Sequence, residues 1–267
     1  EDSQHSALGK ITVQRAFEVS SNVGFSKLVN ENYKEKPEQF INRLYEMGLN
    51  RKLGLEIKGE GQPDIKYTDS EYWSGLSLPM MSMGYEVRMT PMQILALYNA
   101  VANNGKMVKP MFVEEIRFHG KLEKRFGPDV LNNHICSKET LSQVKLMLEG
   151  VVENGTASNL KNTHYKIAGK TGTAQVSLSN EGYVESLYQA SFVGYFPADK
   201  PKYSCIVVVN APSKQIYYGN VVAGPIFRDI TDRIYVREYE LQQNEMQLAD
   251  RTLQSPYSKS GSGYALE

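Results

Sequence analysis

The chain has 267 residues, with 30 Lys and Arg against 30 Asp and Glu, and hydrophobic residues make up 41% of it. This length and composition suit one large domain or two small ones with a sizeable core. A formal net charge of zero lacks the basic excess of a nucleic-acid binder, so no nucleic-acid partner is expected. No apolar run approaches the roughly 20 residues of a membrane helix. The two cysteines form no CxxC motif and the four histidines stand singly, so the sequence indicates no metal site.

The spacing of apolar residues predicts a mainly helical first half. Residues 12–28 read as helical with an interruption at Ser20-Ser21-Asn22, and another helix is expected from Pro37 to Gly48. Residues 51–88 are irregular. Thr90-Pro91-Met92-Gln93 carries an N-cap, a first-turn proline and a capping-box glutamine, which predicts a helix that stops near Gly105. A further helix is expected over residues 137–154.

The last third changes to strand periodicity. Strands are expected over residues 166–176, 190–196 and 203–210, with a polar turn over 196–202. The continuous apolar run Ile206 to Val209 predicts a strand buried on both faces. An amphipathic helix follows over residues 221–236. This order predicts an α+β fold with helices against an antiparallel sheet, ending in a polar tail over residues 238–267.

Two short motifs carry the chemistry. Lys170-Thr171-Gly172-Thr173 lies on a predicted strand, and Ser20-Ser21-Asn22 lies at the helix break. Each motif alone is weak, because a surface lysine on a strand or a polar helix cap explains it equally well. Together and in this order they match two of the three motifs, S-x-x-K, S-x-N and K-T-G, that penicillin-binding proteins and β-lactamases use.

With these motifs, the chain resembles a class B penicillin-binding protein, a peptidoglycan D,D-transpeptidase, and looks closest to the division-type members. The resemblance covers about residues 2–236. It implies the penicillin-binding/β-lactamase-type α+β fold, with residues 1–237 as a partial transpeptidase domain. Further matching blocks are Thr12 to Phe17, Met89 to Gln93, Ala102 to Gly105, Gly155-Thr156-Ala157, Ser191 to Pro197 and Gly219 to Ile230.

The resemblance also implies a role for each motif residue. Ser20 would join the proton-transfer network, and Asn22 would hydrogen-bond the substrate carbonyl and a neighbouring lysine. Lys170 would be a fixed cation that steadies the substrate carboxylate. The hydroxyls of Thr171 and Thr173 would bind that carboxylate, and the N–H of Thr173 would be an oxyanion donor. Gly172 would let the strand approach the nucleophile closely. No cofactor is expected.

The expected nucleophile is missing from the sequence. In the family, S-x-x-K precedes S-x-N, but no such motif occurs among the 19 residues before Ser20. The two S-x-x-K matches, Ser142 to Lys145 and Ser158 to Lys161, fall between the other motifs, which is the wrong order. We therefore expect an N-terminally truncated domain that is inactive alone, from a parent protein that carries the nucleophile upstream.

By resemblance, the parent would bind D-Ala-D-Ala stem peptides and β-lactams and work with division-machinery proteins that include a glycosyltransferase. It would be anchored in the inner membrane with this domain in the periplasm. Two alternatives stay open. A penicillin-sensing or β-lactamase-like acyltransferase shares the motifs, although no glutamate can be assigned as a hydrolytic base. A non-catalytic scaffold of the same fold would also lack S-x-x-K, but would not need an intact K-T-G strand.

Overall fold

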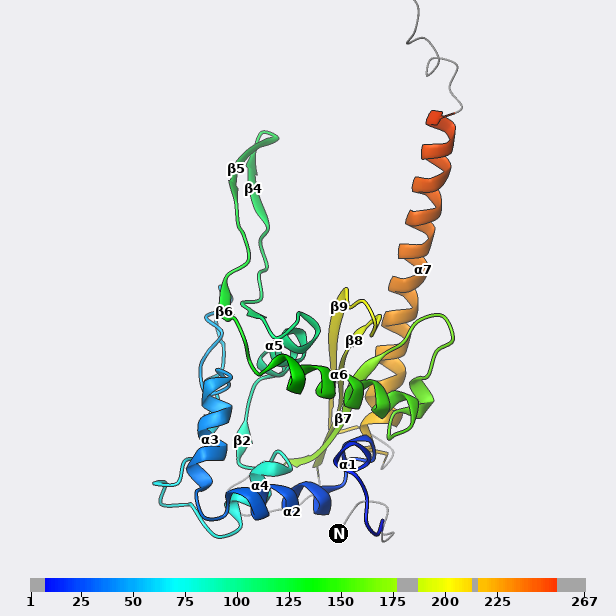
Figure 1. Ribbon diagram of the computed structural model, residues 1–267. Helices are drawn as coiled ribbons and strands as arrows, with labels where there is room; N and C mark the ends of the chain where they lie inside the picture. The colour runs from blue at the N-terminus through cyan, green and yellow to red at the C-terminus, as the bar shows by residue number, and fades with distance from the viewer. Residues whose placement is uncertain (1–7, 177–186, 213–215, 254–267) are drawn as a thin grey trace, which may run out of the picture. The chain divides into compact units, whose positions relative to one another are not determined.

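The computed structural model describes residues 8–176, 187–212 and 216–253 (Figure 1). The chain separates into two compact units, Glu1–Pro225 and Ile226–Glu267. The helices are α1 (Val13–Glu18), α2 (Asn22–Tyr33), α3 (Pro37–Glu46), α4 (Ser77–Ser82), α5 (Pro91–Ala102), α6 (Lys138–Glu153), the 3-10 helix η1 (Ser158–Leu160) and α7 (Gly219–Leu253). The division between the units falls inside α7.

Three of the predicted helix starts are confirmed by side-chain caps. The side chain of Thr12 accepts a hydrogen bond from the N–H of Arg15, and Ser137 does the same for Thr140 at the start of α6. At α5, Thr90 and Gln93 form both hydrogen bonds of the capping box. These caps satisfy backbone donors that the first turn of a helix leaves unpaired.

The central sheet has three antiparallel strands, β7 (Ala168–Val176), β8 (Leu187–Phe196) and β9 (Tyr203–Asn210), with β8 in the middle. The register pairs Lys170 with Val193 and Gly172 with Ser191. All three strands were predicted. The expectation that Ile206 to Val209 is buried on both faces is wrong, because these residues are only half-buried. In the described sheet β9 pairs with β8 alone, so one side of the strand lacks a neighbour.

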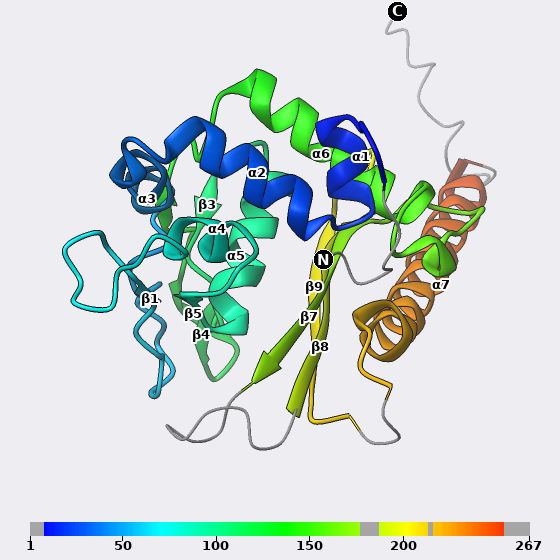
Figure 2. The ribbon, with the colours of Figure 1, turned by 90° about the horizontal axis from the view of Figure 1, so that it is seen from below.

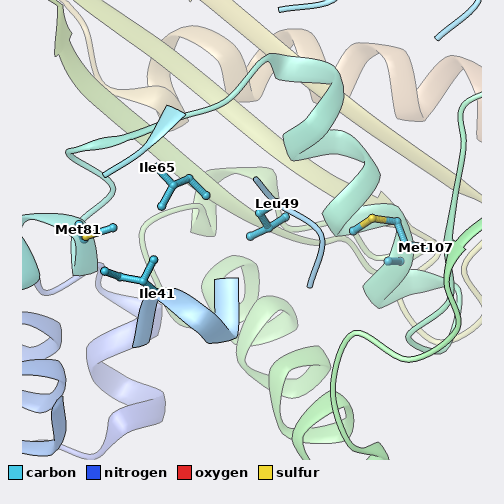
Figure 3. Close-up of a cluster of buried hydrophobic side chains, with 6 residues drawn as sticks. Ile41, Leu49, Ile65, Met81 and Met107 are labelled. Carbon is cyan, nitrogen blue, oxygen red and sulfur yellow. The ribbon is translucent and has the colours of Figure 1, made fainter. Parts of the chain in front are cut away.

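Helices cover this sheet and set the position of its strands. In the first unit, α5 packs against β8 and β9, and α6 packs against β7 (Figure 2). One buried cluster joins α5 and α6 to the sheet through Val101, Leu141, Leu148, Ala168 and Tyr195. A second cluster lies in the helical part of this unit and joins α3, α4 and α5 (Figure 3); its members are Ile41, Leu49, Ile65, Met81, Ala100 and Met107. The expected helical subdomain beside an antiparallel sheet is therefore confirmed.

Several short elements were not predicted. Antiparallel pairs form between β1 (Asp64–Ile65) and β2 (Val87–Arg88), between β3 (Met107–Val108) and β6 (Val130–Asn132), and between β4 (Glu115–Phe118) and β5 (Lys121–Arg125). The β4–β5 pair is a hairpin that projects from the helical part of the unit (Figure 1). Its apolar side chains are largely exposed, with Phe118 at 65%.

The second unit contains the rest of α7 from Ile226, where Arg228 and Asp232 form an ion pair of 2.8 Å across one helical turn. The predicted start of the polar tail at residue 238 falls inside α7, and residues 254–267 lie outside the described part of the chain. Across the described residues, no helix has both the length and the hydropathy to cross a membrane.

Candidate active site

Ser20 lies at a sharp break between α1 and α2. Its φ angle is +55°, in the left-handed region that few residues other than glycine adopt. The N–H groups of Ser20 and Ser21 fold back onto carbonyls of α1, at 3.1 Å from Phe17 O and 2.8 Å from Ala16 O. The hydroxyl of Ser21 caps α2 by accepting the N–H of Gly24 at 3.0 Å. The break is thus held by hydrogen bonds on both sides, and its strain is concentrated at the residue that the S-x-N motif singles out.

Lys170 on β7 reaches this break. Its Nζ atom donates to Ser20 Oγ at 2.8 Å and to the carbonyl of Thr171 at 3.2 Å. The ring of Phe17 lies beside the ammonium group, with its centroid 6.0 Å from Nζ. Burial lowers the pKa of Lys170 to about 8, because loss of water disfavours the charged form. The structure therefore brings one residue of each predicted motif into direct contact.

The residues after Lys170 each have a defined neighbour on another segment. The hydroxyl of Thr171 lies 2.9 Å from that of Thr156, in the loop that follows α6. The hydroxyl of Thr173 accepts the N–H of Gly219 at 3.2 Å. This part of β7 is consequently tied to both the α6–η1 loop and the start of α7.

Gly172 has a local steric reason to be glycine. A Cβ atom on it would lie 2.4 Å from Ser191 Oγ on the neighbouring strand. Gly219 is equally constrained, because its Cβ would lie 2.4 Å from the carbonyl of Ser191 and 2.6 Å from that of Gly172. The side chain of Ser191 accounts for Gly172, and close packing of backbone accounts for Gly219.

Asn22 is the first residue of α2, and its side chain is exposed. Among the described residues, no hydrogen bond to this side chain is present. The hydrogen bond to a neighbouring lysine that sequence analysis expected for Asn22 is therefore not seen in the described part of the chain.

The two out-of-order S-x-x-K matches have other partners. Lys145 donates to Asn104 Oδ1 at 2.9 Å, and Lys161 forms an ion pair of 2.9 Å with Glu153. Ser142 and Ser158 are exposed. The side chains of both lysines therefore bind residues outside their own motifs.

Glu18 and Thr156 contact each other beside the two motifs, and sequence analysis gave neither of them a role. Glu18 is a buried carboxylate in α1, only 4% exposed, and its Oε1 and Oε2 atoms accept hydrogen bonds from Gln14 and Arg15 at 2.9 and 3.1 Å. Its backbone carbonyl accepts the N–H of Thr156 at 3.0 Å. The block Gly155-Thr156-Ala157 was noted in the sequence, but its contacts depend on the packing of α1 beside α6, which no local pattern reveals.

Comparison with known proteins points in one direction. A family model described as the penicillin-binding protein transpeptidase domain matches residues 1–232. Stage V sporulation protein D of Bacillus subtilis is 32% identical over 213 residues, which cover 79% of this chain and 32% of that protein. Peptidoglycan D,D-transpeptidase FtsI of Escherichia coli is 27% identical over 221 residues, which cover 82% of this chain and 34% of that protein.

A solved structure gives the same result for the fold. Penicillin-binding protein 3 of Mycobacterium tuberculosis, in complex with ampicillin, superposes with a TM-score of 0.73 at 28% identity. The match covers 85% of this chain and 51% of that one. The chain spans about a third of the length of the curated relatives it matches.

Proposed function

Because the chain belongs to the penicillin-binding protein transpeptidase domain family, we propose that it forms the S-x-N and K-T-G part of the active site of a peptidoglycan D,D-transpeptidase. The observation that carries this proposal is the contact of 2.8 Å between Lys170 Nζ and Ser20 Oγ. It joins the two family motifs that the sequence contains, although 150 positions separate them. Such a junction of a hydroxyl and a buried cation suits acyl transfer through a serine ester.

The proposed reaction has two steps. A serine hydroxyl of the whole protein attacks the peptide bond of a D-Ala-D-Ala stem peptide, its proton passes to the leaving amine, and D-Ala departs. The amine of a neighbouring stem peptide then attacks the acyl ester. The new amide bond forms the cross-link as the ester bond breaks, and the proton that the amine loses returns to the serine oxygen. A β-lactam acylates the same serine, and its opened ring stays attached. The proposed nucleophile belongs to an S-x-x-K motif that precedes these residues in the whole protein.

Ser20 and Lys170 fit the proton-transfer part of this mechanism. Since Lys170 donates to Ser20 Oγ, the hydroxyl hydrogen of Ser20 is left to donate elsewhere, toward the leaving amine or the nucleophile. With a pKa of about 8, Lys170 remains mostly charged at neutral pH and can also stabilise the substrate carboxylate. Ser20 is thus proposed as a proton relay and Lys170 as its electrostatic partner.

The other motif residues are proposed to bind substrate. The hydroxyls of Thr171 and Thr173 would hold the terminal carboxylate, and the N–H of Thr173 would donate to the oxyanion. The exposed side chain of Asn22, at the start of α2, would hydrogen-bond a substrate carbonyl. Gly172 keeps the strand free of a side chain between these two threonines.

For the whole protein we propose a membrane anchor outside these residues, a periplasmic location of this domain, and association with division proteins that include a glycosyltransferase. The support is the similarity to the transpeptidase FtsI over most of this chain. None of the proposed steps requires a cofactor.

Intact-mass spectrometry after incubation with ampicillin tests the proposal. The chain itself and a version extended upstream to include the S-x-x-K serine are compared. An adduct of one ampicillin mass on the extended version alone is the expected result. An adduct on the chain itself would move the nucleophile to Ser20, Ser142 or Ser158. No adduct on either version would overturn the proposed activity and favour a non-catalytic scaffold.

A further inference from the structure

Thr156 lies between the two motifs and contacts both sides. It belongs to the short loop between α6 and η1, and it is half-buried. Its backbone N–H donates to the carbonyl of Glu18, two residues before Ser20, at 3.0 Å. Its hydroxyl lies 2.9 Å from that of Thr171, the residue after Lys170. One residue therefore joins the end of α1 to the K-T-G strand by two hydrogen bonds.

Two glycines lie against Glu18 at this bridge, Gly155 against its backbone and Gly150 against its side chain. A Cβ atom on Gly155 would lie 2.2 Å from the carbonyl oxygen of Glu18, the same atom that accepts the N–H of Thr156. A Cβ on Gly150 of α6 would lie 2.5 Å from Glu18 Oε1. The close approach of α1 to α6 thus depends on the absence of side chains at positions 150 and 155.

The side-chain half of the bridge determines what the Thr171 hydroxyl can do. A threonine hydroxyl has one hydrogen to donate and two lone pairs that accept. Either hydroxyl of the pair can be the donor. When Thr156 donates, the hydrogen of Thr171 is released for a third group, and the bond polarises the Thr171 hydroxyl toward stronger donation. An anionic group beside Thr171 selects that arrangement, since it can only accept.

We propose that Thr156 is a positioning residue that orients the Thr171 hydroxyl toward the carboxylate of the bound stem peptide or β-lactam. This inference rests on the proposed function and deepens it. Thr156 does not touch the ligand in this proposal. It acts through Thr171, and it also fixes the separation between β7 and the helix end that carries Ser20.

The test uses the protein that includes the S-x-x-K serine, with the variants Thr156→Val, Thr156→Ser and Thr163→Val. Valine keeps the shape of threonine without the hydroxyl, serine keeps the hydroxyl, and Thr163 is an exposed threonine in the same part of the first unit. The concentration of half-saturation and the limiting rate of acylation are measured for ampicillin and for ampicillin methyl ester, which has no carboxylate.

For Thr156→Val, we expect the half-saturating concentration of ampicillin to rise roughly three- to tenfold, with the limiting rate nearly unchanged. The methyl ester should show no such rise, because it has no charge for Thr171 to bind. Thr156→Ser should restore ampicillin binding, and Thr163→Val should behave like the unmodified protein. Equal losses for both ligands would show a merely structural role, and no loss would show no role; either result overturns the proposal.

If the unmodified extended protein is not acylated at all, the proposed function fails, and the assignment of Thr156 to carboxylate binding fails with it. The hydrogen-bond bridge has its own test in that case. The unfolding midpoints of Thr156→Val, Thr171→Val and the double variant are measured and compared. A double variant that unfolds close to the less stable single variant supports the bridge. Fully additive shifts would show that the two hydroxyls are not coupled.

Discussion

The ammonium group of Lys170 lies 2.8 Å from the hydroxyl of Ser20, and burial lowers the pKa of that lysine to about 8. The ordinary value for the side chain is 10.5. The lysine is therefore easier to deprotonate in the folded chain than in the unfolded chain. This difference links the stability of the fold to pH.

Between pH 8 and pH 10.5 the unfolded chain retains the proton on Lys170 while the folded chain loses it. The unfolded state then binds more protons, so the free energy of unfolding rises with pH in this window. We expect the difference in unfolding free energy between the unmodified chain and Lys170→Met to grow by at most about 3 kcal/mol between these two pH values. Urea denaturation at several pH values measures it, and the tyrosine titrations common to both chains cancel. A difference that stays constant with pH would mean that Lys170 has an ordinary pKa.

Gly155→Ala should destabilise the first unit strongly. The new Cβ atom would lie 2.2 Å from a backbone oxygen, and a backbone atom cannot move aside as the end of a side chain can. We expect a loss of about 2 kcal/mol or more in unfolding free energy. Gly75→Ala is the matched control, because its Cβ would have no heavy atom within 4 Å. Similar losses at both positions would contradict the close approach of α1 and the α6–η1 loop.

Thr90→Ala should cost about 1 kcal/mol in stability, because it removes the N-cap of α5. The Thr90 side chain accepts the N–H of Gln93 at 3.2 Å, and the Gln93 side chain accepts the N–H of Thr90 at 2.8 Å. Thr90→Ser keeps the hydroxyl and should retain most of that stability. Thermal unfolding of the three chains measures the effect, and equal midpoints for the alanine and serine variants would argue against the cap.

The Glu60 carboxylate should stabilise the fold at neutral pH but not at strongly acidic pH. Partial burial raises its pKa, but hydrogen bonds from the N–H groups of Leu55, Leu53 and Gly54 outweigh that effect and lower it overall. A lowered folded-state pKa contributes stability above the unfolded value of about 4.5, and this contribution disappears as the pH falls through the folded value.

We expect Glu60→Gln to destabilise the chain by about 1 kcal/mol at pH 7, a modest value because solvent screens a partly exposed group. The loss should shrink toward pH 3. Glu123→Gln, the same substitution at an exposed carboxylate in β5, serves as the control. A loss at position 60 that is the same at pH 3 and pH 7 would mean that the charge of Glu60 does not contribute.

The elements that were predicted correctly are those specified by local residues. The capping box at Thr90 and the three strands of the central sheet follow from side chains within one segment. The elements that were missed depend on distant partners or on exposure. β3 has two residues and pairs with β6 about two dozen positions later, and the β4–β5 hairpin is too exposed for apolar alternation to predict it. Likewise, Ile206 to Val209 are apolar but only half-buried, because strand composition does not determine how many neighbours a strand has.

The candidate site, too, could be predicted from the sequence only in part. The types and order of residues in S-x-N and K-T-G were sufficient to identify candidates on two segments. The contact of Thr156 with Thr171 could not be predicted, because it requires the loop after α6 to lie between those segments. The burial of Glu18 was also missed, because a carboxylate in a helix is ordinarily expected to face solvent.

The contact between Lys170 and Ser20 closes a loop of 150 residues. Contacts between such distant residues form slowly, because much of the chain entropy must be lost before they contribute. The sheet hairpin β7–β8 is far more local and can be complete before α1 is in place. Local opening of α1 would therefore separate the two motifs while leaving the sheet intact. Hydrogen exchange at the N–H of Thr156 would then report the lifetime of the assembled site, independently of the global stability of the fold.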